Sequence, residues 1–322
     1  MTTESTRQFT AIHPETNVGV LSLSVSDLER SLAYYTDEIG LEALHRSASS
    51  ATLGITGEPV LLLTESKNAQ PWPRDTRQGH PGLYHFAILL PSRADLGRWL
   101  RHRLDRGHAL PGQADHLVSE ALYLEDPDGH GIEIYADRPR AQWQWDSGRV
   151  QMGLDPLDIG SLLAEGDAGN APWRGLPAGT RLGHMHLQVH DIDRAAEFYH
   201  DLLGFDIVGQ MPSALFVSAG GYHHHLGMNT WHSHRQPRAP ANTAELRFFT
   251  IHLPTEESRD QVLRRLDTAG VPYTRSGNLV TLQDPSGNTI LLRVGKVSDV
   301  DAAAELNAIF AESADKDGVA KI

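Results

Sequence analysis

At 322 residues, the chain is long enough for two domains that each bury their own hydrophobic core. Its formal net charge of -13 argues against nucleic acid or an anionic membrane as a partner, and the absence of cysteine excludes disulfides, thiolate metal sites and cysteine nucleophiles. Because it has no run of ~18 apolar residues and no basic leader followed by an apolar segment, we expect a cytoplasmic protein without a membrane span.

The first predicted module begins with an alternating strand at residues 18–25, and Asp27 then stands where a helix N-cap belongs. Apolar side chains follow at helical spacing until Gly40, which can end the helix: Leu28, Leu32, Tyr35 and Ile39. Short strands are predicted at residues 43–45, 51–55 and 60–64. The pattern predicts a β-α-β-β-β module of about fifty residues.

A second module follows a polar, proline-containing connector at residues 65–81. It has a strand at 84–90, a helix at 94–105 and a strand-turn-strand at 123–135. This order of elements repeats that of the first module.

The turn of the second module, at residues 126–129, reads Asp-Pro-Asp-Gly, in which proline presets φ and glycine can adopt φ > 0. On the return strand, Glu133 points to the face opposite Ile132 and Ile134. A buried carboxylate without a partner is costly, so Glu133 must either face water or meet a partner.

The chain then repeats itself, and internal repeats take priority in the interpretation of a sequence. The segment at Gly183 aligns without a gap on the segment at Gly19, and the residues that coincide include Leu187, Val189, Asp191, Arg194, Tyr199 and Gly204. A fourth segment, at residues 246–294, repeats the second, and its Asp-Pro-Ser-Gly turn at 284–287 matches the turn at 126–129.

We therefore predict an α+β protein of four β-α-β-β-β modules that form two open mixed β-barrels with helices outside, because such sheets must pair to bury apolar faces and protect edges. Modules one and two are assigned to residues 17–138, and modules three and four to residues 181–295. A linker at 139–180 with a short helix at 158–165 separates them, and a helical tail occupies 296–322.

Four such modules, with Val-x-Asp-(Leu/Ile) helix starts and Asp-Pro-x-Gly turns over residues 17–295, resemble the vicinal oxygen chelate superfamily. This superfamily includes glyoxalases, bleomycin resistance proteins and dioxygenases. The fold alone does not decide among these functions, so the ligand positions must. The resemblance implies metal ligands on the first and last strands of modules.

Those ligand positions fall on His85, Glu133 and His184. The equivalent positions of modules one and four are apolar: Val20, Phe248 and Leu291. Two histidines and one glutamate are the facial triad of non-haem Fe(II) sites, and Mn(II) or Zn(II) are alternatives. His186, two residues along the strand from His184, is a reserve ligand.

The accessory residues resemble those of the type I extradiol catechol 2,3-dioxygenases. Tyr123 stands ten residues before Glu133, with His116 upstream, and the resemblance gives both a hydrogen bond to the bound diol. His224 matches an acid-base histidine. The run at 223–225 also fits a surface tract that binds metal adventitiously.

The triad departs from the family pattern, in which modules three and four supply it. If modules paired in chain order, His184 would lie in a different barrel from His85 and Glu133. We therefore predict that module two pairs with module three, and that modules one and four form a metal-free barrel.

The resemblance implies an extradiol dioxygenase that uses Fe(II) and O₂ to open a catechol-type diol in aromatic hydrocarbon catabolism. One alternative is a glyoxalase-like lyase or isomerase, which normally takes two carboxylates and two imidazoles. Another is a metal-free binding or resistance protein. Exposed sheet edges also predict self-association into a homo-oligomer.

Overall fold

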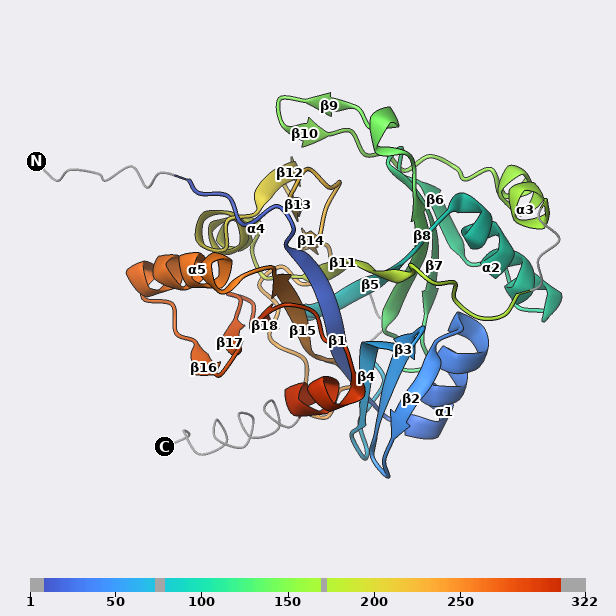
Figure 1. The fold of residues 1–322 in the computed structure, drawn as a ribbon, viewed down its shortest axis with the longest axis horizontal. Coiled ribbons are helices and arrows are strands. Elements are labelled where there is room, and N and C mark those ends of the chain that lie inside the picture. The colour runs from blue at the N-terminus through green and yellow to red at the C-terminus, as the bar shows by residue number, and fades with distance from the viewer. Residues whose placement is uncertain (1–8, 73–78, 169–172, 308–322) are drawn as a thin grey trace, which may run out of the picture.

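The computed structural model describes residues 9–72, 79–168 and 173–307. Two eight-stranded mixed sheets occupy the centre, and the helices lie outside them (Figure 1). This arrangement confirms the predicted fold class.

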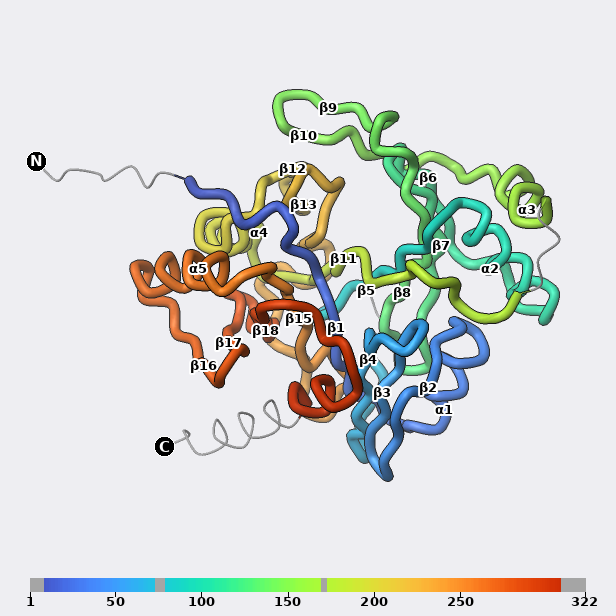
Figure 2. Tube along the Cα trace, viewed as in Figure 1, coloured from blue at the N-terminus to red at the C-terminus, as the bar shows by residue number. Residues whose placement is uncertain are grey.

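The first sheet joins modules one and four, in the strand order β16-β17-β18-β15-β1-β4-β3-β2. β1 pairs parallel with β4 of its own module and antiparallel with β15 of module four, so modules one and four meet at the first strand of the chain (Figure 2). The strands are β1 (Asn17–Val25), β2 (Glu42–Arg46), β3 (Ser50–Ile55), β4 (Glu58–Glu65), β15 (Leu246–Leu253), β16 (Thr274–Ser276), β17 (Leu279–Gln283) and β18 (Thr289–Val294).

The second sheet joins modules two and three, in the order β12-β13-β14-β11-β5-β8-β7-β6. β11 pairs antiparallel with β5, which confirms the predicted pairing of module two with module three. The strands are β5 (Gly82–Leu90), β6 (Gly112–Asp115), β7 (Ser119–Glu125), β8 (Gly131–Asp137), β11 (Arg181–Gln188), β12 (Asp206–Met211), β13 (Ala214–Ser218) and β14 (Leu226–Asn229).

The helices of modules one and three differ from the regular helices that the sequence predicts. Each starts as an α-helix and continues as a π-helix: α1 (Leu28–Ala33) with η1 (Tyr34–Ile39), and α4 (Ile192–Ala196) with η3 (Glu197–Leu202). In module one the wide turn closes where the Gly40 N–H donates to the Tyr35 carbonyl at 3.1 Å. Modules two and four carry α2 (Arg93–Asp105) and α5 (Glu256–Ala269).

The segment between modules two and three is structured. It contains η2 (Arg140–Gln142), a hairpin of β9 (Trp145–Asp146) and β10 (Arg149–Val150), and α3 (Ile159–Asp167). α3 packs on α2 where Gly97 and Gly166 meet, since a Cβ on Gly97 would lie 2.3 Å from the Leu162 carbonyl oxygen and one on Gly166 would lie 2.5 Å from the Gly97 carbonyl carbon.

One apolar core serves both sheets, because the inward faces of their strands and helices join in a single cluster that includes Leu21, Phe249, Ile88 and Met185. Side chains alternate along a strand, so the opposite face of each sheet points away from this core. The chemistry predicted from the sequence lies on that opposite face of the second sheet.

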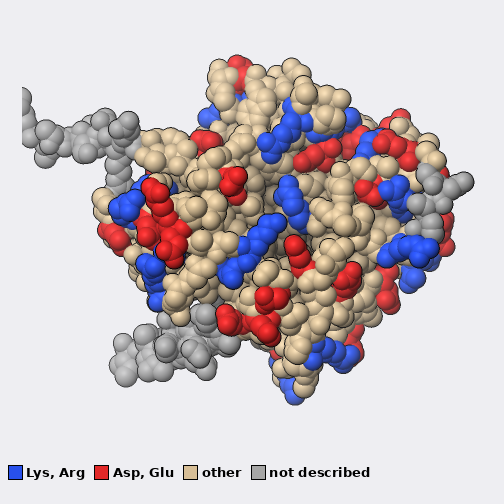
Figure 3. Space-filling model, in the orientation of Figure 1, with Lys and Arg blue, Asp and Glu red and all other residues tan. Residues whose placement is uncertain are grey.

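The surface carries mixed charge, with acidic and basic side chains interspersed over the face in Figure 3. Within residues 9–72, 79–168 and 173–307, no helix has the length and apolarity to cross a membrane.

The Asp-Pro-x-Gly turns join modules that belong to different sheets. The Tyr35 hydroxyl of module one donates to Asp126 of module two at 2.8 Å, and both side chains are buried. Tyr199 of module three donates to Asp284 of module four at 3.0 Å. Each buried hydrogen bond therefore ties the two sheets together.

The two turn aspartates differ in their ionisation. Burial opposes the charge of Asp126, but the attraction and hydrogen bond of His130 outweigh it, so the pKa of Asp126 is lowered. Burial also opposes the charge of His130, which would lower its pKa, but the attraction and hydrogen bond of Asp126 outweigh burial and raise this pKa. At Asp284 the partner is the neutral amide of Asn288, burial prevails, and the pKa is raised.

The variant His130→Asn, which copies Asn288 into module two, is expected to lower the free energy of unfolding by about 1–3 kcal/mol near about pH 5.5. Because the folded-state pKa of His130 is raised, its contribution is complete below the unfolded value of about 6.5 and is lost as pH rises through the folded value. Because the folded-state pKa of Asp126 is lowered, its contribution to stability is lost only in acid, below the unfolded-state pKa of about 3.9. Urea unfolding should therefore show a larger loss near about pH 5.5 than near about pH 9. The reciprocal variant Asn288→His is the control, and an equal loss at both pH values would contradict the ion pair.

Candidate metal centre

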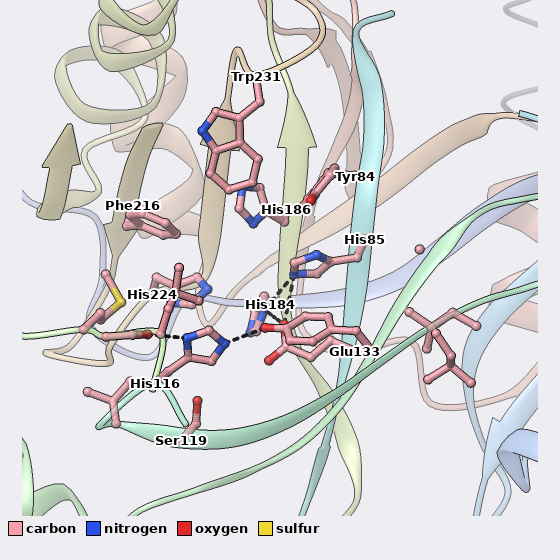
Figure 4. A pocket seen from close by; sticks show the side chains of 18 of the residues that line it. Tyr84, His85, His116, Ser119, Glu133, His184, His186, Phe216, His224 and Trp231 are labelled. Carbon is pink, nitrogen blue, oxygen red and sulfur yellow. Dashed lines mark hydrogen bonds and ion pairs between the residues drawn. The ribbon is translucent and has the colours of Figure 1, made fainter. Parts of the chain in front are cut away.

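Three buried polar side chains meet on the second sheet (Figure 4). Glu133 Oε2 lies 3.0 Å from His85 Nε2 and 3.1 Å from His184 Nε2, and the two Nε2 atoms are 3.4 Å apart. Among the residues that the structure describes, no other group of three His, Asp or Glu side chains gathers its ligand atoms this closely. The structure thus brings together the three residues predicted as ligands.

Strand register explains this convergence. His184 on β11 and Glu133 on β8 are both register partners of Ala87, on the strand β5 between them. His85 precedes Ala87 by two residues and points to the same side of the sheet. Since Ala87 ends at Cβ, it leaves the space above it free for side chains from three strands.

The arrangement fits a divalent first-row metal. Such an ion lies about 2.1 Å from its nitrogen and oxygen ligands, so ligand atoms at right angles are about 3.0 Å apart. The separations of 3.0, 3.1 and 3.4 Å agree with three such ligands on one face of an octahedron. Two imidazoles and a carboxylate are also donor groups that Fe(II), Mn(II) and Zn(II) accept.

The ionisation of the group suits metal binding as well. Burial raises the pKa of Glu133, but the charges and hydrogen bonds of His184 and His85 outweigh it and hold this pKa well below its usual value. Burial lowers the pKa of His85. An ionised carboxylate and a neutral imidazole are the forms that bind metals.

Tyr123 and His116 lie beside the triad. Tyr123 pairs directly with Glu133 across β7 and β8, which accounts for their spacing in the sequence. The His116 Nδ1–H donates to the Gly153 carbonyl at 2.7 Å, so Nε2 accepts from the Tyr123 hydroxyl at 2.6 Å.

The segment that holds His116 belongs to the linker, which sequence analysis treats only as a connection. The Gly153 N–H donates to the His116 carbonyl at 3.1 Å, and Asp155 and Asp115 exchange backbone hydrogen bonds. Met152 and Leu154 line the cavity next to the triad. The linker sequence has neither strand nor helix periodicity here, so no signal in it predicts a wall of the site.

His224 contacts the triad, since its ring centroid lies 4.2 Å from that of His184. Its Nδ1 is 2.8 Å from His223 Nδ1, and His223 Nε2 is 3.0 Å from Asp137 Oδ1. All three histidines at 223–225 are buried, so the alternative of a surface tract is wrong. Burial holds the pKa of His224 well below its usual value, which favours the neutral ring.

Asp137 is a residue of this site that sequence analysis misses. A signal was present, because Asp137 follows Glu133 by four residues on β8 and therefore faces the same side of the sheet. Without the fold, nothing connects it to the histidines of module three.

The reserve ligand His186 lies outside the group of three. The Asn229 amide donates to His186 Nε2 at 3.0 Å, and His186 is the register partner of His85. The geometry therefore favours His184 as the ligand from β11.

A cavity of about 1000 Å³ opens beside the triad (Figure 4). Three of its lining residues are large apolar residues from separate segments that remain exposed to solvent. Their exposed fractions are 82% for Leu154, 51% for Met211 and 46% for Trp231. Phe216 adds an aromatic wall near His224, with ring centroids 5.2 Å apart. No lysine or arginine is among the described residues that line this cavity.

The equivalent face of the first sheet is closed. The predicted apolar positions Val20, Phe248 and Leu291 lie in one buried cluster with Ala303 and Leu306. The last two belong to a helical segment at residues 300–307, and the rest of the predicted tail lies outside the described residues. The helical segment at 300–307 thus fills the place that corresponds to the candidate metal site in the other sheet.

Comparisons with known proteins agree with this architecture. The family model of the Glyoxalase/Bleomycin resistance protein/Dioxygenase superfamily matches residues 17–134 and 181–292. Over 280 residues the chain is 46% identical to the catechol-2,3-dioxygenase of Bacillus subtilis (strain 168), with 86% of this chain and 96% of that protein covered.

Solved structures share the fold at low sequence identity. A provisionally assigned dioxygenase from Bacillus subtilis superposes with a TM-score of 0.56 at 12% identity, over 89% of this chain and 86% of that chain. Glyoxalase I from Zea mays gives a TM-score of 0.51 at 16% identity, over 90% and 95% of the two chains.

Proposed function

Because the chain belongs to the glyoxalase/bleomycin resistance/dioxygenase superfamily, we propose that His85, Glu133 and His184 bind Fe(II) and that the protein is an extradiol dioxygenase of catechol-type diols. The observation that carries this proposal is the buried triad, assembled from two modules beside an open cavity. The Bacillus subtilis relative named as a catechol-2,3-dioxygenase supports it. A cytoplasmic location and self-association stay predictions.

Bound iron would act as a Lewis acid that lowers the pKa of a diol hydroxyl and leaves positions for the diol and O₂. The net reaction breaks the ring bond beside the diol and adds one oxygen atom of O₂ to each of the separated carbons. Neutral His224 is placed to accept a diol proton. Because the Tyr123 hydroxyl donates its proton to His116, its oxygen is placed to accept a hydrogen bond from a diol hydroxyl.

Replacing Tyr123 with phenylalanine is expected to lower kcat/KM by roughly 10²-fold, since it removes a hydrogen bond to the reacting diol. Iron content should stay the same, because Tyr123 is not one of the three ligands. Steady-state O₂ uptake and metal analysis measure the two quantities. The variant His116→Gln should have a similar effect, and an unchanged kcat/KM in Tyr123→Phe would refute this role.

The cavity supports a diol with an uncharged, apolar substituent. Its volume of about 1000 Å³ far exceeds the needs of a single ring, and Leu154, Met211 and Trp231 offer exposed apolar surface for an alkyl or aryl group to cover. A carboxylate substituent would find no lysine or arginine among the described lining residues.

The test is anaerobic loading with Fe(II), then addition of a diol and air while dissolved O₂ and the visible spectrum are followed. We expect a yellow product in amounts equal to the O₂ consumed. A 4-butylcatechol should have a KM at least roughly tenfold below that of catechol, because each buried methylene contributes about fourfold. The anionic 3,4-dihydroxybenzoate should be the poorest of the three.

Other outcomes would redirect the assignment. Stoichiometric iron without O₂ uptake for any diol would favour a glyoxalase-like reaction. If the protein bound no metal, the remaining assignment would be a metal-free binding protein.

A further inference from the structure

A line of three polar side chains runs from the cavity into the protein, and the proposed chemistry uses only its first member. The line is His224, His223 and Asp137, joined by contacts of 2.8 Å between the two Nδ1 atoms and 3.0 Å from His223 Nε2 to Asp137 Oδ1. His223 has no exposed surface. A fully buried histidine that is hydrogen-bonded to a partly exposed carboxylate has no assigned role in the proposed reaction so far.

We infer that Asp137 and His223 are positioning residues that fix the ring orientation and the proton-bearing nitrogen of His224. This inference rests on the proposed ring-cleaving function. It follows from the direction in which the hydrogen bonds of the line must run.

The direction is set at the Asp137 end. A carboxylate only accepts hydrogen bonds, so His223 Nε2 must carry a proton and donate it to Asp137. In a neutral imidazole the other nitrogen is then an acceptor, so His223 Nδ1 accepts from His224 Nδ1–H. The remaining nitrogen of His224, Nε2, therefore keeps its lone pair.

Nε2 is the nitrogen left free to react. Among the described residues, the one hydrogen bond of the His224 ring is the bond through Nδ1, and His224 lines the cavity. When Nε2 takes a proton from the diol, Nδ1–H continues to donate to His223. Asp137 then lies at the far end of the line and stabilises the positive charge, as the third member of a catalytic triad does.

The surroundings hold the line in place. The Tyr222 hydroxyl donates to the same Asp137 oxygen at 3.1 Å, and the Tyr135 and Tyr222 hydroxyls are 2.8 Å apart. The His223 ring lies 5.3 Å from Trp143, between centroids. His223 therefore cannot turn over without breaking buried contacts.

The first measurement is the nitrogen-15 spectrum of the histidine rings in the Zn(II)-loaded, diamagnetic full-length protein. We expect His224 to carry its proton on Nδ1 in the wild type. A proton on Nε2 would overturn the inference, whatever the enzyme catalyses and whether or not any variant folds.

The second measurement is a double-mutant cycle with Asp137→Ala and His224→Ala in the iron-loaded enzyme. Asp137→Ala should lower kcat roughly 10- to 100-fold, with KM and iron content within about twofold of wild type. Combined with His224→Ala it should add no further loss, because Asp137 acts through His224. His225→Gln, which alters the neighbouring histidine in the run, is the matched control and should leave kcat within about threefold.

The outcomes distinguish a failure of the positioning role from a failure of the proposed function. A further 10- to 100-fold loss in the double variant, or a fall in iron content in Asp137→Ala, would overturn the positioning role. If wild-type protein consumed no O₂ with any diol, the proposed function would fail, and the nitrogen-15 spectrum would still report the state of His224.

Discussion

Glu133→Ala and His184→Ala should each reduce bound iron to below about 0.1 equivalent per chain and lower the rate of ring cleavage by more than ~10³-fold. Each change removes one of the three proposed ligands, whose donor atoms lie between 3.0 and 3.4 Å apart. The two ligands come from different modules, so equal losses would demonstrate a metal site shared across β5 and β11. Metal analysis after desalting and O₂ uptake with catechol provide the measurements.

His186 provides the control for this experiment, because it lies on the same strand and faces the same side as His184. Its Nε2 already accepts a hydrogen bond from Asn229. His186→Gln should therefore retain iron. If His186→Gln lost iron and His184→Ala kept it, the assignment of the β11 ligand would be reversed.

The second large effect is expected at His224. His224→Ala should lower kcat by roughly 10²–10⁴-fold, the range typical for loss of a general acid-base residue. Bound iron should remain near the wild-type level, since His224 does not belong to the three-residue group. Single-turnover O₂ consumption under saturating catechol, beside metal analysis, separates this variant from the ligand variants.

The result would be decisive in either direction. Loss of iron in His224→Ala would make His224 a fourth ligand, as a glyoxalase-like site requires. A kcat within about threefold of wild type would remove His224 from proton transfer altogether.

Much of this site could be predicted from one sequence because the four modules are internal repeats that can be aligned with one another. The repeat that places Gly183 on Gly19 also sets the register of His184 against Val20, and it shows which modules retain polar residues at the ligand positions. Counting those positions was enough to predict the crossed pairing that the strand order confirms.

What the sequence could not predict depends on contacts between segments without periodic patterns. Met152 and Leu154 are placed in the cavity wall by backbone hydrogen bonds between the linker and β6, and backbone hydrogen bonds of this kind cannot be predicted from the spacing of side chains. The contact of Asp137 with His223 joins two modules that meet only after the sheets form. The π-helical turns are equally hidden, since apolar residues at the same spacing also fit a regular helix.

The crossed pairing of modules also imposes an order on synthesis. The sheet that carries the triad needs no strand beyond β14, whereas Val18 in β1 must wait for its partner Ile251 in β15. Segments emerge from the ribosome in chain order, and pairing between distant strands is slow. The half with the chemistry can therefore close first, while one edge of β1 stays unpaired and open to aggregation until the last module is made. A nascent chain of this protein should depend on chaperones for the sheet formed by modules one and four.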